Sequence, residues 1–151
     1  MAERNMDMKK CPMPVQDPDV RNKNFDEVAL GYTYDMAVNE ARRCLNCPKK
    51  PCQSACPVQI DIPAFIERVA NEDMDGAFEI LSKSTSLPAV CGRVCPQENQ
   101  CEGKCVRGIK GEAVGIGRLE RFVADYHREH CTDTPEMPEQ NGHKVAVIGA
   151  G

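Results

Sequence analysis

Hydrophobic positions recur with helical spacing in several stretches between residues 33 and 130. The first stretch follows Thr33, a residue type that caps helices, and predicts a helix that presents Cys44 on its buried side, at its C-terminal end. Pro48 and Pro51 are expected to end this helix, which leaves Cys47 and Cys52 on a turn. The residues that share its apolar face are Ala37, Ala41, Cys44 and Leu45.

Two shorter helical patterns lie in the middle of the chain. Asp61 is placed to cap the first, with Pro63 in its opening turn, and Asp75 is placed to cap the second. Their apolar stripes are Ile62, Phe65, Ile66 and Val69 in one and Ala77, Phe78 and Leu81 in the other. The short connection predicts that the two helices pack as an antiparallel pair. A further helical turn is expected over residues 89–95, ended by Pro96.

The last pattern predicts a helix from Ile116 to His130. Its apolar stripe consists of Ile116, Leu119, Phe122, Val123 and Tyr126, whereas Arg118, Arg121 and Asp125 are expected to face away. Glu120 falls at the edge of the stripe, where a half-buried carboxylate requires a partner.

The two ends of the chain lack helical patterns. Prolines make residues 1–32 an extended lead-in, in which Phe25, Val28 and Leu30 are expected to pin the segment onto a neighbouring surface. Residues 131–143 are typical of a linker. Residues 144–151 consist of a β-branched run followed by Gly-x-Gly. This pattern predicts the first strand of a truncated dinucleotide-binding domain, with Gly149 and Gly151 as cofactor-binding glycines. The predicted fold class is thus a small all-α domain over residues 33–130.

Composition narrows the class of protein. The 19 basic and 23 acidic residues are interspersed, so no basic face indicates nucleic acid or an anionic membrane surface. The start of the chain is polar and no run is apolar enough to span a membrane, so we expect a cytoplasmic protein. Disulfides are rare in that compartment, and the 10 cysteines therefore favour metal binding.

Most of the cysteines lie in two blocks that each contain a Cys-Pro pair. The first block is Cys44, Cys47, Cys52 and Cys56-Pro57, and the second is Cys91, Cys95-Pro96, Cys101 and Cys105. Zinc sites usually show repeated Cys-x₂-Cys pairs, and here only Cys44 and Cys47 have that spacing. Closely spaced cysteines that end in Cys-Pro are typical of iron–sulfur clusters. We favour clusters, with zinc and disulfides as the alternatives.

The motifs also resemble those of a known family. They are the Cys-x₂-Cys-x₄-Cys-x₃-Cys-Pro block, Leu87-Pro-Ala-Val-Cys-Gly-Arg-Val-Cys-Pro-Gln97, residues 101–105, Ile116-Gly-Arg-Leu-Glu-Arg121, residues 24–32 and the terminal Val-Ala-Val-Ile-Gly-Ala-Gly. This pattern is similar to the N-terminal helical domain of the NADPH-dependent glutamate synthase small subunit. Similar domains open dihydropyrimidine dehydrogenase and electron-bifurcating ferredoxin:NADP oxidoreductases.

The resemblance implies a helical ferredoxin-type domain with two [4Fe–4S] clusters and interleaved ligands. Matched by position, one cluster takes Cys44, Cys47, Cys52 and Cys105, and the other takes Cys56, Cys95, Cys101 and Glu120. Cys91 matches a family cysteine that is not a ligand in dihydropyrimidine dehydrogenase, and it is the substitute if Glu120 does not bind. Cys11 and Cys131 lie outside the blocks and are not expected to hold a cluster.

The implied function is electron transfer within an oxidoreductase that uses NADPH and FAD in its full-length form. The implied partners are the FAD- and NADPH-binding domains of the same chain and the large subunit of glutamate synthase. The alternatives are a subunit of a bifurcating ferredoxin:NADP oxidoreductase or sulfide dehydrogenase, and a zinc-stapled interaction module. No nucleophile–base pair or carboxylate dyad is evident, so no catalytic residue is expected in this chain.

One more set of metal-binding residue types lies at the end of the last predicted helix. His127, His130 and Cys131 could form a site, but histidines are common near the negative end of a helix dipole. We favour that simpler interpretation.

Overall fold

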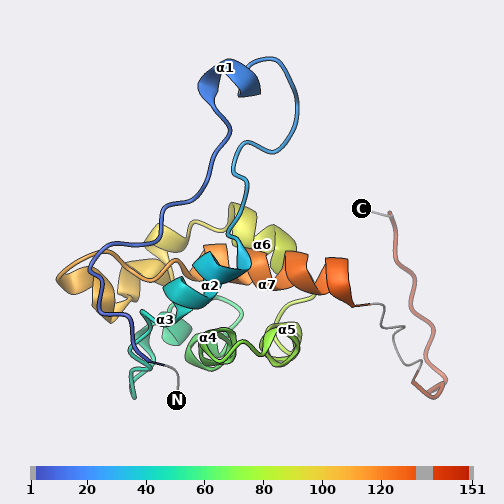
Figure 1. The fold of residues 1–151 in the computed structure, drawn as a ribbon. Coiled ribbons are helices and arrows are strands. Elements are labelled where there is room, and N and C mark those ends of the chain that lie inside the picture. The colour runs from blue at the N-terminus through green and yellow to red at the C-terminus, as the bar shows by residue number, and fades with distance from the viewer. Residues whose placement is uncertain (1–2, 132–137, 150–151) are drawn as a thin grey trace.

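A computed structural model describes residues 3–131 and 138–149 of the chain (Figure 1). The α-helices are α1 (Pro18–Arg21), α2 (Tyr34–Ala41), α3 (Pro51–Ser54), α4 (Ile62–Ala70), α5 (Met74–Ser82), α6 (Pro88–Val94) and α7 (Ile116–His130). Three short 3₁₀ turns, η1 (Gln97–Asn99), η2 (Glu102–Lys104) and η3 (Val106–Ile109), precede α7. Over the described residues no strand forms, which confirms the all-α prediction.

Helix α7 is the element on which the other helices pack. Helices α2, α4, α5 and α6 all contact it, and Figure 1 shows it lying across the tops of α4 and α5. Its bounds agree with the prediction, and the apolar stripe is buried as expected, at Ile116, Leu119, Phe122 and Val123. The core of the domain therefore lies between this stripe and the inner faces of α2, α4 and α5.

The expectation that Arg121 faces away from the core is wrong. This side chain is buried on α7, and its guanidinium donates to the carbonyl oxygen of Ala29 at 2.9 Å. It also pairs with Glu27 at 3.2 Å and Asp125 at 3.4 Å. The long apolar stem of an arginine can cover core surface while its head reaches polar partners, and a helical-wheel pattern does not detect that arrangement.

Helix α2 begins as predicted but ends early. The Thr33 hydroxyl accepts a hydrogen bond from the Met36 amide at 3.3 Å, which confirms the cap. The helix ends at Ala41, before Cys44, so the prediction that Cys44 lies within it is wrong. Tight turns end the helix, with the Cys44 amide bound to the Ala41 carbonyl at 3.0 Å, and the prolines at 48 and 51 play no part in stopping it.

Helices α4 and α5 form the predicted helix pair, in contact and side by side (Figure 1). Asp61 caps α4 as expected, accepting from the Ala64 amide at 3.4 Å. The cap of α5 is Asp73, which accepts from the Gly76 amide at 2.9 Å, and the assignment of that role to Asp75 is wrong. The chain turns sharply at Glu72, where φ is +66°, and this turn places Asp73 at the cap position.

The lead-in is attached differently from the prediction. Phe25, Val28 and Leu30 are exposed, on a loop that stands away from the helices in Figure 1. The base of this loop is closed by an isolated antiparallel bridge between Val15 and Ala29. These apolar side chains therefore do not pin the segment. Polar contacts do so instead, because the Tyr32 hydroxyl donates to the Cys11 carbonyl at 2.7 Å.

The C-terminal residues show no strand. Residues 144–149 have exposed side chains and, over the described ranges, no neighbouring strand with which to pair, so the predicted β-strand is not formed. Gly149 has a φ of +99°, which glycine adopts readily. Gly151 and residues 132–137 of the predicted linker lie outside the described residues. No helix among the described residues is long and apolar enough to cross a membrane.

Gly92 marks the closest approach between α6 and α7. A Cβ atom at this position would lie 2.5 Å from the Arg121 backbone nitrogen, so the two helix backbones would have to separate. We expect Gly92→Ala to lower the free energy of unfolding by about 1–3 kcal/mol, the usual effect of overpacking. Gly108→Ala is the control, because its Cβ would meet Ala113 at an ordinary 3.7 Å. Equal stabilities of the two variants in chemical denaturation would contradict this close approach.

Candidate metal centre

The cysteines of the two blocks converge, and none of them is paired in a disulfide. The first thiol group consists of Cys44, Cys47, Cys52 and Cys105, which line a single cavity. Its remaining wall is largely apolar and includes Leu45, Ile62, Ile66, Val106, Val114 and Ile116. In this cavity three cysteines of the first block lie together with Cys105, the last cysteine of the second block. These four residues are the ligand set that the family resemblance implies for one cluster.

Burial raises the pKa values of two thiols of this group, Cys44 and Cys52. It raises the pKa of Cys44 to about 11, while a hydrogen bond from the Asn46 backbone acts in the opposite direction. The neighbouring thiols Cys52, Cys105 and Cys47 raise the Cys44 pKa further, since a thiolate would be repelled by others nearby. The pKa of Cys52 is raised for the same reasons. Several sulfurs thus share a space with little water, a suitable environment for a positively charged metal centre.

The backbone around Cys47 is bent in a way that few side chains favour. Asn46 and Lys50 both adopt left-handed φ angles, +49° and +42°. The ammonium group of Lys50 contacts both carboxylate oxygens of Asp61 at 2.8 and 2.9 Å, which ties this bend to the cap of α4. Such backbone persists where surrounding contacts enforce it, and it is common at functional sites. The two bends turn the chain back so that Cys47 and Cys52 reach the cavity of Cys44.

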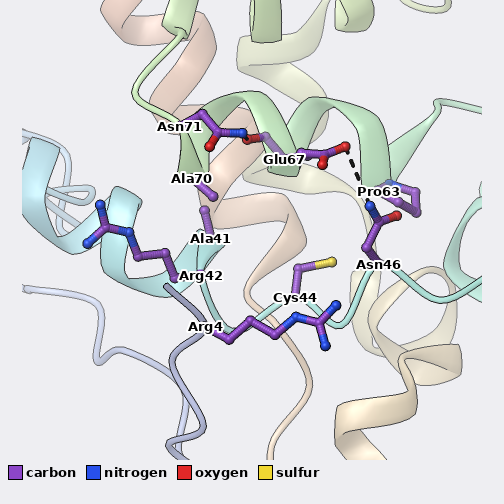
Figure 2. Close-up of a pocket in the computed structure, with 9 residues that line it drawn as sticks. All are labelled: Arg4, Ala41, Arg42, Cys44, Asn46, Pro63, Glu67, Ala70 and Asn71. Atoms are coloured by element: carbon purple, nitrogen blue, oxygen red, sulfur yellow. Dashed lines mark hydrogen bonds between the residues drawn. The ribbon is translucent and has the colours of Figure 1, made fainter. Parts of the chain in front are cut away.

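A second hollow lies on the other side of Cys44. Figure 2 shows Cys44 in this hollow between Arg4 and helix α4, with Arg42 nearby. A hydrogen bond from Asn46 to Glu67, 3.4 Å long, closes one edge of it. The Arg4 guanidinium donates to the Leu45 carbonyl oxygen at 3.4 Å, beside this cysteine, whereas the Arg42 guanidinium points away from it and pairs with Glu72.

Arg107 is a residue of the first cavity that the sequence analysis missed. It is buried, lines the same cavity as the first thiol group, and donates a hydrogen bond to the Asp7 carbonyl. Its guanidinium would offset part of the negative charge of thiolates bound to a metal. The one indication of this role in the sequence is that Arg107 comes two residues after Cys105. That indication is weak, because the chain has 19 basic residues.

The second thiol group consists of Cys56, Cys95 and Cys101. Cys56 and Cys101 are buried. Burial raises the pKa of Cys101 to about 12, and the nearby Glu102, Cys56 and Glu120 raise it further. The pKa of Cys95 is raised by burial, and Cys91, Glu120 and Cys56 add to the shift. These mutual effects place the three cysteines and Glu120 within electrostatic range of one another.

Glu120 has a carboxylate oxygen without a hydrogen-bond partner. The residue is 6% exposed, and its Oε1 atom is buried with no partner among the described residues. Burial raises the pKa of this carboxyl to about 7. A native structure rarely leaves a carboxylate in that state, because an unpaired buried polar group costs free energy. The sequence places Glu120 at the edge of the stripe, and the structure buries its carboxylate with one oxygen available as a metal ligand.

Cys91 lies close to the second thiol group as well. A hydrogen bond with Cys91 contributes to the raised pKa of Cys95, and the Cys91 sulfur lies 3.7 Å from the Thr85 hydroxyl oxygen. The geometry therefore leaves open whether Cys91, in place of Glu120, is the fourth ligand of this site.

The separation of the sulfurs bears on which metal they fit. A single zinc ion with sulfur ligands at about 2.3 Å holds them roughly 3.8 Å apart. Among the described residues, the one group of at least three Cys, His, Asp or Glu ligand atoms that all lie within 4.8 Å of one another contains no cysteine of either block. Over the described residues, therefore, no three block cysteines stand at the mutual separations that a single zinc ion requires. A four-iron cluster, the larger group that thiolates bind, holds its ligands farther apart.

Comparison with known proteins gives a family and several relatives. Residues 21–132 match the family model described as dihydropyrimidine dehydrogenase domain II, 4Fe-4S cluster. The chain is 39% identical over 127 residues to the NAD-dependent dihydropyrimidine dehydrogenase subunit PreT of Escherichia coli K12, covering 84% of the chain and 31% of the relative. It is 37% identical over 149 residues to the glutamate synthase [NADPH] small chain of the same strain, covering 97% and 31%.

The relatives are much longer than this chain. A putative oxidoreductase from Escherichia coli K12, AegA, is 36% identical over 139 residues, which is 88% of the chain but 20% of the relative. The chain thus spans a third or less of these curated relatives, all of which are named as oxidoreductases or their subunits.

Proposed function

This chain belongs to the family described as "dihydropyrimidine dehydrogenase domain II, 4Fe-4S cluster", and we propose that it is an electron-transfer domain with two [4Fe–4S] clusters. The observation that carries the proposal is the gathering of Cys44, Cys47, Cys52 and Cys105 around one cavity, from blocks far apart in the sequence. Four convergent thiols with an apolar wall suit a four-iron cluster in both number and ligand type.

The second cluster would be held by Cys56, Cys95, Cys101 and Glu120. The support is the effect of Cys56 and Glu120 on the pKa values of Cys95 and Cys101, together with the buried, unpartnered Oε1 of Glu120. An oxygen ligand in place of a thiolate changes the donor strength and charge at one iron, which is one means by which a protein adjusts a cluster's reduction potential.

When bound, such clusters supply reversible one-electron transfer. The chain's own residues have three tasks in this scheme. The cysteines of the two thiol groups bind the clusters together with Glu120. The apolar walls formed by α4, η3 and the start of α7 exclude water, and Arg107 supplies a fixed positive charge beside the first thiol group. The helices that carry the two sites pack on one another, which would keep the clusters near each other for electron transfer.

In the whole protein, electrons would pass between a flavin and a partner. We propose the small-chain role in glutamate synthase, in which NADPH reduces FAD and the large subunit forms glutamate, in a cytoplasmic complex. The support is the 37% identity over nearly the entire chain. The equally strong likeness to PreT favours, as a second candidate, a subunit of a dihydropyrimidine dehydrogenase. A bifurcating ferredoxin:NADP oxidoreductase is the remaining alternative.

Anaerobic reconstitution with iron and sulfide tests the cluster proposal. We expect a brown protein with about eight iron atoms and as many labile sulfides per chain, the content of two four-iron clusters. A colourless chain that holds stoichiometric zinc and no iron would refute the proposal. The choice between glutamate synthase and PreT functions needs the partner, tested by pulling down the large subunit of each enzyme.

Glu120 can be tested separately from the cysteines. We expect Glu120→Ala to alter or remove one cluster and leave the other unchanged, because the carboxylate belongs to the second site alone. Electron paramagnetic resonance of the reduced chain, together with the iron content, reports each cluster. Glu129→Ala is the matched control, since Glu129 lies on the same helix but is exposed.

Unchanged spectra in Glu120→Ala would contradict the assigned role of the carboxylate. A second variant, Cys91→Ser, distinguishes the alternative. If Cys91 were the ligand, this variant would lose the cluster that Glu120→Ala retains.

A further inference from the structure

A second set of metal-binding side chains lies where α7 ends against α5. The side chains of Asp75, His127 and Cys131 each place one potential ligand atom within 4.8 Å of the other two. The Cys131 thiol already donates to the Asp75 carboxylate, with 3.3 Å between Sγ and Oδ1. None of these residues belongs to either thiol group.

The fold positions the three residues by ordinary helix geometry. His127 and Cys131 are four residues apart, so they share a face, and the Cys131 amide continues the helical pattern by donating to the His127 carbonyl at 2.8 Å. Asp75 lies in the first turn of α5, which packs against α7. The packing of two helices thus brings Asp75 to His127 and Cys131, which lie 52 or more positions later in the sequence. The spacing of the histidine and the cysteine does not reveal that Asp75 is near them.

The imidazole of His127 is held in place and has an unused nitrogen. Its ring stacks on Phe78, with centroids 3.5 Å apart and planes 9° apart. Its Nδ1 atom is buried, with no hydrogen-bond partner among the described residues. His130 behaves differently, because it stacks on Tyr126 and its Nδ1 lies 2.9 Å from the Tyr126 carbonyl oxygen. The sequence-based set of His127, His130 and Cys131 is therefore corrected, with Asp75 in place of His130.

We propose that Asp75, His127 and Cys131 bind a zinc ion, with the fourth position open to water. Thiolate, imidazole and carboxylate are the donor types that zinc takes, and a thiolate among them selects against magnesium and calcium. A thiolate and a carboxylate balance the charge of Zn²⁺. The thiol must release its proton on binding, and the ion then replaces the present thiol–carboxylate hydrogen bond.

The ion would fasten the end of α7 to the start of α5. The spacing of the three atoms is close to what the metal needs, because ligands at about 2.0–2.3 Å from zinc lie roughly 3.3–3.8 Å from each other in a tetrahedral site. The separation between Cys131 and Asp75 already lies in that range.

The test uses the chain with its iron–sulfur clusters in place, so that the block cysteines are not available to zinc. Cobalt(II) or zinc is titrated under anaerobic conditions, and bound metal and iron are both counted by elemental analysis. We expect one zinc per chain without loss of iron, and cobalt bands typical of a tetrahedral site with a thiolate. Cys131→Ser and Asp75→Asn should each weaken binding at least tenfold, as should His127→Ala.

His130→Ala and Cys11→Ser are the matched controls and should bind as tightly as the unmodified chain. Circular dichroism identifies a variant that fails to fold. Cys131→Ser changes one atom at the helix end, so it is the variant whose folding we expect to be disturbed least. Zinc that enters only as iron leaves, or a stoichiometry that the three site variants do not change, would overturn the proposal.

Discussion

Replacing Cys105 with serine is expected to remove about half of the iron from the reconstituted chain, because one of two four-iron clusters loses a ligand. Serine is a poor ligand for these clusters, which select the softer thiolate. The cluster lost should be the one that Cys44, Cys47 and Cys52 support, although Cys105 lies in the other block. Iron, labile sulfide and the resonance spectrum of the reduced chain measure the loss.

The complementary variant is Cys101→Ser, which should remove the other cluster and leave the first intact. The double variant should retain almost no iron. Cys11→Ser serves as the control because Cys11 lies outside both groups. The interleaved assignment would fail if Cys105→Ser and Cys101→Ser eliminated the same spectroscopic signal.

Replacing Arg43 with alanine should lower the free energy of unfolding by about 3–5 kcal/mol, the usual effect of breaking a buried ion pair. Arg43 is 1% exposed and lies 2.6 Å from the carboxylate of Glu40, which is fully buried. The variant leaves that carboxylate without its counter-charge. It also removes donors to the backbone carbonyls of Asp7 at 3.0 Å and Glu112 at 2.7 Å.

The neighbouring arginine provides the control for this prediction. Arg42 forms an exposed pair with Glu72 at 3.3 Å, and pairs of that kind contribute about 0–1 kcal/mol. Chemical denaturation of the cluster-loaded chain, monitored by helical circular dichroism, compares Arg43→Ala with Arg42→Ala. A similar midpoint for the two variants would show that the buried pair does not hold the domain together.

The buried pair also illustrates what the sequence could and could not predict. Periodicity located α7 closely, because a long amphipathic helix with one apolar stripe produces a strong local signal. Glu40 and Arg43 gave no such signal. Their partners, which include the Gly115 amide at 2.8 Å from Glu40, lie far along the chain, and burial of a charge depends on those distant contacts.

The same contrast holds for the candidate site. The spacing of the cysteines and the Cys-Pro pairs indicated clusters, and the position of Glu120 indicated a half-buried carboxylate that needs a partner. The end of α2 and the burial of Arg121 were mispredicted, because each depends on how separate segments meet. Asp75 was assigned to a cap, whereas its nearness to His127 and Cys131 arises from the packing of two helices.

The joining of Cys105 to the first block has a consequence for how the protein is made. A ribosome synthesises the chain from its N-terminus, so Cys44, Cys47 and Cys52 emerge well before their fourth partner. The second site is likewise incomplete until Cys101 and α7 have emerged. On the proposed ligand assignment, neither cluster would have its full ligand set in a half-translated domain, so we expect cluster insertion to follow the synthesis of α7.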